Sequence, residues 1–297
     1  MEVAPGIHRI ESDLGPRFMC QYLFAGDDRT LLFDTGLAAT PADVIASYLQ
    51  GAGFSLEQID YVITSHADID HCGGNRSIKE LVPEASLMCH ELDRAWVESN
   101  AAIMAENYGW HEAYGFPQFD DDARATMLRD LGGDQGVDVG LRGGERIRLG
   151  PGWTVEIMHL PGHTLGHLGI WDERSRSAII IDAVLEAGIY DRSGNRLIPP
   201  RYYTAAGYRQ TISRIRSLQP HLLLTAHYPV MEAGDALAWL DRSLAFTESL
   251  EALVRSGLEE GTTDLWKLTQ HVDEKLGPYP DFMTELGAPV RAHAHGL

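Results

Sequence analysis

Residues 66–71 read His-Ala-Asp-Ile-Asp-His, and this segment limits the folds open to the chain more than any other. It places four side chains of metal-binding type, those of His66, Asp68, Asp70 and His71, directly after the short apolar run 61–64. Imidazole and carboxylate groups are common protein ligands of Zn²⁺, iron and Mn²⁺. A polar surface loop with chance histidines is the plainer alternative, and the density of these residues disfavours it. The segment therefore predicts a metal site at the end of a buried strand.

Three further residues of metal-binding type follow apolar runs in the same way. His163 lies in Pro-Gly-His-Thr-Leu-Gly-His, which comes after a predicted strand at 154–159. Asp182 and His227 each end an apolar run of their own. Taken singly, each is more often a structural residue than a ligand. Together with the first segment they predict one shared site.

Strand-like and helix-like stretches alternate through the chain in two successive halves. Strands are predicted over residues 7–10, 21–25, 30–33 and 61–64, and then over 146–149, 154–159, 168–171, 178–181 and 222–225. Helices are predicted over residues 41–50, 75–81 and 205–218. This order predicts an α/β fold in which two mixed β-sheets pack together between outer helices.

The chain is expected to form one main domain over residues 1–230, followed by an extension over 231–297 that packs on the same domain. The extension reads as helical to about residue 276 and then as a polar tail. Residues 91–130 interrupt the pattern with helical and aromatic stretches. This insertion either covers the site or forms a plain surface hairpin, and the sequence does not decide between the two.

The series of motifs resembles that of the metallo-β-lactamase superfamily. The resemblance covers about residues 1–230 and includes the turn Asp34-Thr35-Gly36. It implies an αββα sandwich in which residues 1–230 form the catalytic domain. Because this fold hosts many chemistries, the resemblance predicts the fold more firmly than the substrate.

The resemblance also implies two divalent metal ions, most readily zinc, with iron or manganese as alternatives. It implies that a hydroxide shared by the metals attacks the substrate and that Asp70 steers this hydroxide or carries a proton. His167 and Asp34 are expected to be structural rather than ligands. The implied ligands are His66, Asp68 and His163 for one metal, Asp70, His71 and His227 for the other, and Asp182 as a bridge.

Position 68 departs from the family pattern, because Asp68 stands where a second histidine is usual. Two divalent ions, three carboxylates and one hydroxide have no net formal charge, whereas the two-carboxylate version keeps one positive charge. A more neutral site is expected to be a weaker electrophile and to favour iron or manganese over zinc. An acidic residue at this position also resembles the di-iron branch of the same fold.

Candidate substrate-binding residues lie in the connection 190–203 and beside His227. Arg201 and Tyr202 are expected to bind a substrate carboxylate or acyl oxygen, and Tyr228 to donate to an oxyanion. Loop polarity and aromatic packing are an equal alternative for each of them.

The formal net charge of −19 argues against nucleic acid and an anionic membrane surface as partners. The three cysteines match no zinc-finger or redox motif and are expected to be free thiols in a cytoplasmic protein. The sequence thus predicts a metal-dependent hydrolase of a small-molecule ester, lactone or thioester, and a homodimer is compatible with it. A stand-alone di-iron oxidoreductase and a non-catalytic metal-containing sensor remain as alternatives.

Overall fold

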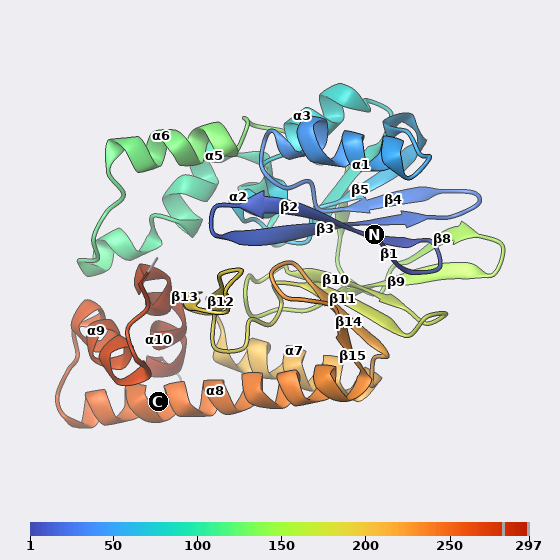
Figure 1. Ribbon diagram of the computed structural model, residues 1–297. Helices are drawn as coiled ribbons and strands as arrows, with labels where there is room; N and C mark the ends of the chain where they lie inside the picture. The colour runs from blue at the N-terminus through green and yellow to red at the C-terminus, as the bar shows by residue number, and fades with distance from the viewer. Residues whose placement is uncertain (281–282, 296–297) are drawn as a thin grey trace.

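Two mixed β-sheets form the centre of the fold, which a computed structural model describes for residues 1–280 and 283–295 (Figure 1). The first sheet has the order β1 to β7, and its last four strands, β4 to β7, run parallel. Its strands are β1 (Glu2–Ala4), β2 (Ile7–Leu14), β3 (Arg17–Ala25), β4 (Thr30–Phe33), β5 (Ile59–Ile63), β6 (Ser86–His90) and β7 (Val139–Leu141).

The second sheet has the order β15-β14-β11-β10-β9-β8, and β11 and β14 are its parallel pair. A separate hairpin pairs β12 with β13. The strands of this half are β8 (Arg146–Gly150), β9 (Trp153–His159), β10 (Leu168–Asp172), β11 (Ser177–Ile181), β12 (Ile189–Tyr190), β13 (Arg196–Ile198), β14 (Leu222–Thr225) and β15 (Met231–Glu232).

Three apolar clusters show how the layers stack. Successive side chains of a strand point to opposite faces, so Tyr22 and Phe24 of β3 pack between the sheets while Leu23 faces the outer helices. In the same way Ile179 of β11 lies between the sheets and Ile180 packs against the helices on the other side. Both faces of each sheet are therefore covered, which explains the nearly continuous apolar runs in these strands. The expected αββα sandwich is confirmed.

Helices cover the outer faces of both sheets (Figure 1). On the first sheet, the turn η1 (Pro41–Ile45) continues into α1 (Ala46–Gly51), and α3 (Asn75–Leu81) packs beside them. On the second sheet lie α7 (Ala205–Leu218) and the long α8 (Ala233–Glu259). Within residues 1–280 and 283–295 no helix has the length and apolar character needed to cross a membrane.

The insertion and the C-terminal helices meet at the edge of the sandwich that carries the short helix α2 (Ile69–Cys72) (Figure 1). The rings of Phe116 in the insertion and Trp266 in α9 lie 4.7 Å apart, and Gly287 begins α10 against the Phe116 ring. The insertion contains α4 (Arg94–Glu98), α5 (Asn100–Ala102), η3 (Ile103–Asn107), η4 (Trp110–Tyr114) and α6 (Asp121–Asp130). The C-terminal elements after α8 are α9 (Leu265–Leu276), η5 (Met283–Leu286) and α10 (Gly287–Ala294).

One expectation about local structure needs correction, and several short strands were not predicted. The predicted polar tail after residue 276 is wrong for η5 and α10, because Leu286, Val290 and His293 are buried there; residues 281–282 and 296–297 of that tail lie outside the described residues. The strands β6 and β7 and the hairpin β12–β13 were not predicted, since most of them are too short to show a period. The three cysteines are free, as expected, and all three are buried.

Candidate metal centre

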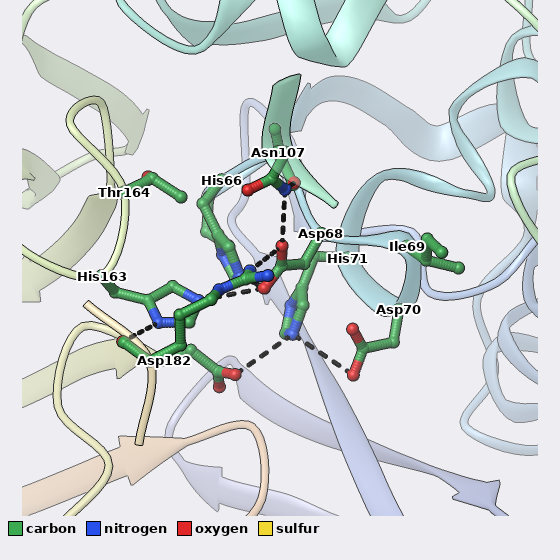
Figure 2. A network of polar contacts seen from close by, with 12 residues as sticks. His66, Asp68, Ile69, Asp70, His71, Asn107, His163, Thr164 and Asp182 are labelled. Atoms are coloured by element: carbon green, nitrogen blue, oxygen red, sulfur yellow. Dashed lines mark hydrogen bonds and ion pairs between the residues drawn. The ribbon is translucent and has the colours of Figure 1, made fainter. Parts of the chain in front are cut away.

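The candidate ligands come together at one edge of the sandwich, between the two sheets (Figure 2). His66 follows β5, and α2 carries Asp70 and His71, while Asp182 follows β11. His163 lies in the loop between β9 and β10, and His227 follows β14. Three groups of these side chains each bring their ligand atoms within 4.8 Å of one another: His66 with Asp68 and His163, His66 with His71 and Asp182, and Asp70 with His71 and His227.

The backbone around α2 explains why this segment can lie so deep in the fold. Two glycines follow it, and both are in tight contact with neighbouring backbone. A Cβ atom on Gly73 would lie 2.3 Å from the carbonyl oxygen of Asp130, and one on Gly74 would lie 2.4 Å from that of Thr35. Only glycine allows this approach, which brings His71 against the end of β4.

All four histidines of the centre have their Nδ1 atom within hydrogen-bond distance of a protein oxygen. In each case this leaves Nε2 to face the other ligands, which is how metal-binding imidazoles are usually oriented. The partners of His163 and His227 are backbone carbonyls, which only accept hydrogen bonds, so both rings carry a proton on Nδ1. The partners, each at 2.8 Å, are Ser65 Oγ for His66, Asp34 Oδ2 for His71, the Arg201 carbonyl for His163 and the Phe18 carbonyl for His227.

Atoms facing the centre lack hydrogen-bond partners within the described part of the chain. His71 Nε2 and Asp182 Oδ1 are buried without one, although buried polar groups are normally paired. His71 Nε2 lies 3.6 Å from Asp182 Oδ2 and 3.7 Å from Asp70 Oδ2. These distances are too long for good hydrogen bonds and suit atoms that share a cation. The donor set of imidazoles and carboxylates therefore fits divalent metal ions.

The electrostatics of the centre also favour a cation. Burial opposes protonation of His71, yet the neighbouring Asp70 and Asp182 hold the pKa of its imidazole above the usual range. Burial likewise opposes ionisation of Asp70, but His71 and His227 hold the pKa of its carboxyl below the usual range. The site is thus a buried cluster of carboxylates that stabilises positive charge beside it.

Asp34 does more than form the turn that the sequence predicted. It has a left-handed backbone with φ of 67°, and its side chain is fully buried. Its carboxylate accepts hydrogen bonds from the Ser65 amide at 2.7 Å and the Ser65 hydroxyl at 2.8 Å, and it contacts His71 Nδ1. Asp34 is therefore a positioning residue for His71. Its place at the end of β4, next to β5, was the signal in the sequence.

The loop that carries His163 is fixed by a residue that sequence analysis did not single out. Asp93 accepts hydrogen bonds from the Thr164 hydroxyl and, at 2.8 Å, from the Gly166 amide. Burial raises the pKa of Asp93 to about 6, although these hydrogen bonds act in the opposite direction. His167 ends the loop and stacks on the ring of His66 with centroids 4.6 Å apart. His167 is absent from the three ligand groups, which accords with the expected structural role.

A cavity of about 250 Å³ opens above the centre. Asp70, Asp182 and His227 lie among its lining residues, and most of its walls are apolar. The insertion contributes Tyr108, Phe119, Thr126, Met127 and Asp130, and the C-terminal segment contributes Glu285. Of the two roles considered for the insertion, the structure therefore supports the cover over the site.

The expected substrate-binding residues do not all reach this cavity. Arg201 lines it but is paired with Asp68 and Glu285. Tyr202 is fully buried, stacks on Tyr208 with ring centroids 4.3 Å apart, and lies with its hydroxyl 2.9 Å from His293 Nε2.

The hydroxyl of Tyr228 is likewise held inside the fold, because it donates to the Leu185 carbonyl at 2.6 Å. Neither Tyr202 nor Tyr228 is among the lining residues of the cavity. Both pack in the apolar core between the second sheet and its helices. Arg17, which sequence analysis passed over, does line the cavity. Among the described residues its guanidinium has no carboxylate within ion-pair distance, and its Nε is buried without a hydrogen-bond partner.

The chain belongs to the metallo-beta-lactamase superfamily, whose family model matches residues 17–227. It is 31% identical to a hydroxyacylglutathione hydrolase of Bdellovibrio bacteriovorus over 88 residues, which are 30% of this chain and about a third (32%) of that relative. It is 22% identical over 233 residues to the probable metallo-hydrolase YqjP of Bacillus subtilis, covering 73% of this chain and 69% of that protein. A metallo-beta-lactamase family protein from Thermus thermophilus shares the fold, with a TM-score of 0.73 and 22% identity over 98% of this chain and 93% of its own.

The role of Asp34 can be tested by changing it to Asn, which keeps the shape but replaces one acceptor oxygen with an NH₂ donor. That donor opposes the Nδ1–H of His71, so the ring is expected to carry its proton on Nε2 instead. We expect metal affinity to fall by about 10- to 100-fold, measured by competition with a chromophoric chelator.

Asp172→Asn is the matched control. Asp172 is also fully buried and accepts hydrogen bonds from Trp153 Nε1 at 3.0 Å and the Ser175 amide at 3.1 Å. Because it does not lie in the metal centre, its variant is expected to lose stability without losing metal affinity. A folded Asp34→Asn variant that binds metal as tightly as the wild type would refute the role assigned to Asp34.

Proposed function

We propose that this protein is a metal-dependent hydrolase of a small ester, lactone or thioester. The observation that carries the proposal is the set of four histidines whose Nε2 atoms face three carboxylates beneath a largely apolar cavity. The partial similarity to hydroxyacylglutathione hydrolases supports a hydrolytic reaction and includes thioesters among the substrates to test.

Seven residues would hold two metal ions in this proposal. Divalent metals supply polarisation of the substrate's carbonyl oxygen and a nucleophile that is available near neutral pH. The first metal would be held by His66, Asp68 and His163, the second by Asp70, His71 and His227, and Asp182 would lie between them. The contacts of Asp182 support this place, because its Oδ2 lies 3.2 Å from His227 Nε2 and 3.6 Å from His71 Nε2.

Asp70 is the residue best placed to act on a proton. Its side chain is 18% exposed and lines the cavity, whereas the side chain of Asp182 is only 4% exposed. Its pKa below the usual range keeps the carboxylate ionised at neutral pH, so it can accept a proton or hold the attacking group by a hydrogen bond. This supports the catalytic role that we assign to Asp70.

The cavity favours a substrate with an apolar part and a negative charge. Leu14, Phe119, Leu185 and Ile198 line the cavity and would exclude water from an acyl or alcohol group. Arg17 lines the same cavity, and its guanidinium has no carboxylate partner among residues 1–280 and 283–295. Guanidinium groups bind carboxylates well. We therefore assign substrate anchoring to Arg17 in place of Tyr202 and Tyr228.

A di-iron oxidoreductase is the second candidate function, and one observation favours it. Asp68 adds a third carboxylate to the centre, and carboxylate-rich sites suit iron and manganese better than zinc. Iron content, a charge-transfer band and consumption of O₂ would separate this candidate from a hydrolase.

The hydrolase proposal predicts metal-dependent turnover. Protein stripped by a chelator and reloaded with Zn²⁺, Mn²⁺ or Fe²⁺ should hydrolyse at least one class among aryl esters, thioesters and lactones, while the stripped protein should not. Asp70→Asn should lower kcat by at least about 100-fold, since a positioned acid–base group contributes this much, and Asp172→Asn should not. Loaded protein that hydrolyses none of the three classes but consumes O₂ would favour the second candidate instead.

The assignment of Arg17 predicts a change in substrate preference. Arg17→Met should raise the KM for a carboxylate-bearing ester by about 10-fold, because a hydrogen bond to a charged group is lost, and leave the KM for its neutral analogue unchanged. Arg148→Met is the control, since Arg148 pairs with Asp28 on the surface, with its side chain 66% exposed. Equal effects on the charged and neutral esters would contradict the assignment.

A further inference from the structure

The two oxygens of Asp68 have different partners. Oδ2 lies 3.0 Å from His163 Nε2 and 3.3 Å from His66 Nε2, so it belongs to the candidate metal centre (Figure 2). Oδ1 points away from these rings and accepts hydrogen bonds from Asn107 Nδ2 at 3.0 Å, Tyr108 Oη at 3.3 Å and Arg201 Nη2. Asp68 therefore has one oxygen left to offer a metal.

Arg201 forms a buried ion pair with the Asp68 carboxylate. Its side chain is 6% exposed; Nη2 contacts Asp68, and the other terminal nitrogen, Nη1, lies 3.1 Å from Glu285 Oε2. A buried guanidinium is costly unless it is paired, and Asp68 is the more deeply buried of its two acidic partners, with 10% of its side chain exposed against 17% for Glu285. The ring of Tyr108 lies within 5.5 Å of the guanidinium, so the pair is enclosed.

The ion pair of Asp68 with Arg201 makes the formal charge of the centre less negative than a count of its carboxylates alone suggests. Asp68 adds one negative charge where the family pattern has a neutral histidine, and Arg201 adds one positive charge in contact with it. Together they are neutral. Glu285 pairs with the other terminal nitrogen of the guanidinium and is the more exposed of the two carboxylates, so it is the outer partner and Asp68 the inner one.

We propose that Arg201 is a positioning residue that makes Asp68 a one-oxygen, charge-compensated substitute for a histidine ligand. The centre is thereby adjusted to prefer zinc over manganese, against the expectation from its three carboxylates alone. The inference concerns metal choice and depends on the proposed function only in requiring that the centre bind metal.

Two substitutions at Arg201 separate its charge from its shape. Arg201→Met leaves the negative charge of the Asp68 carboxylate uncompensated, with only Asn107 and Tyr108 still donating to Oδ1. The ratio of Zn²⁺ to Mn²⁺ affinity should therefore fall by at least about 10-fold. Arg201→Lys keeps the positive charge beside Asp68 but loses the forked geometry of the guanidinium. Because the proposal attributes the metal preference to charge, this variant should hold the ratio within about 3-fold of the wild type. Arg209→Met is the control, because Arg209 pairs with Glu251 at 2.6 Å outside the centre.

A double-mutant cycle tests whether the two residues act as a unit. Asp68→His alone leaves the buried guanidinium without its inner partner and should weaken Zn²⁺ binding at one site by at least about 10-fold. Adding Arg201→Met should restore the affinity to within about 3-fold of the wild type. Affinities are read by chelator competition, and the Co²⁺ absorption spectrum reports the change of ligand.

The possible outcomes distinguish this inference from the proposed function. An unchanged Zn²⁺ to Mn²⁺ ratio in Arg201→Met, or additive effects in the cycle, would overturn the inference alone. Wild-type protein that binds both metals without hydrolysing any ester would overturn the hydrolase proposal. The affinity measurements on the Arg201 variants would still test the inference about metal choice. If Asp68→His does not fold, the comparison of Arg201→Met with Arg201→Lys still shows whether the charge of Arg201 sets the metal preference.

Discussion

Four imidazoles and the carboxylates of Asp68 and Asp182 are buried between the two β-sheets, with the partly exposed Asp70 beside them, and the surrounding fold is arranged to give these groups partners. Such a cluster is stable only if every polar atom has a partner or a cation to bind. The fold meets the requirement on one side by giving each Nδ1 atom a protein oxygen at 2.8 Å. On the other side the Nε2 atoms and carboxylate oxygens converge, and buried atoms such as His71 Nε2 remain without partners in the described chain. A metal centre is the arrangement that satisfies both sides.

Much of this could be predicted from the sequence, because the ligands follow apolar strands. A strand buried on both faces gives a continuous apolar run, and a polar residue at its end stands out. His66, Asp182 and His227 were predicted in this way, and the structure brings them together. The sandwich of two sheets between outer helices was predicted from the same apolar runs. The strand β7, with three residues, was too short to show any period.

The remaining features depend on contacts between distant parts of the chain, which a single sequence does not reveal. Arg201 and Asp68 are 133 residues apart, so nothing local shows that they are paired. Tyr202 and Arg201 are neighbours in a polar connection, yet one packs on Tyr208 and the other reaches the cavity. Arg17 follows a hairpin turn and resembles an ordinary surface residue in the sequence. The pairing of Asp68 also changes the interpretation of its charge, because a count of carboxylates omits the buried guanidinium.

We propose that seven residues of this chain hold two metal ions side by side. Diffraction from crystals of metal-loaded protein, measured at the absorption edge of the metal, tests it most directly. We expect two anomalous peaks about 3.5–4 Å apart, as in other two-metal sites, with Asp182 beside both. A single peak, or peaks that lie away from His66, His71, His163 and His227, would contradict it.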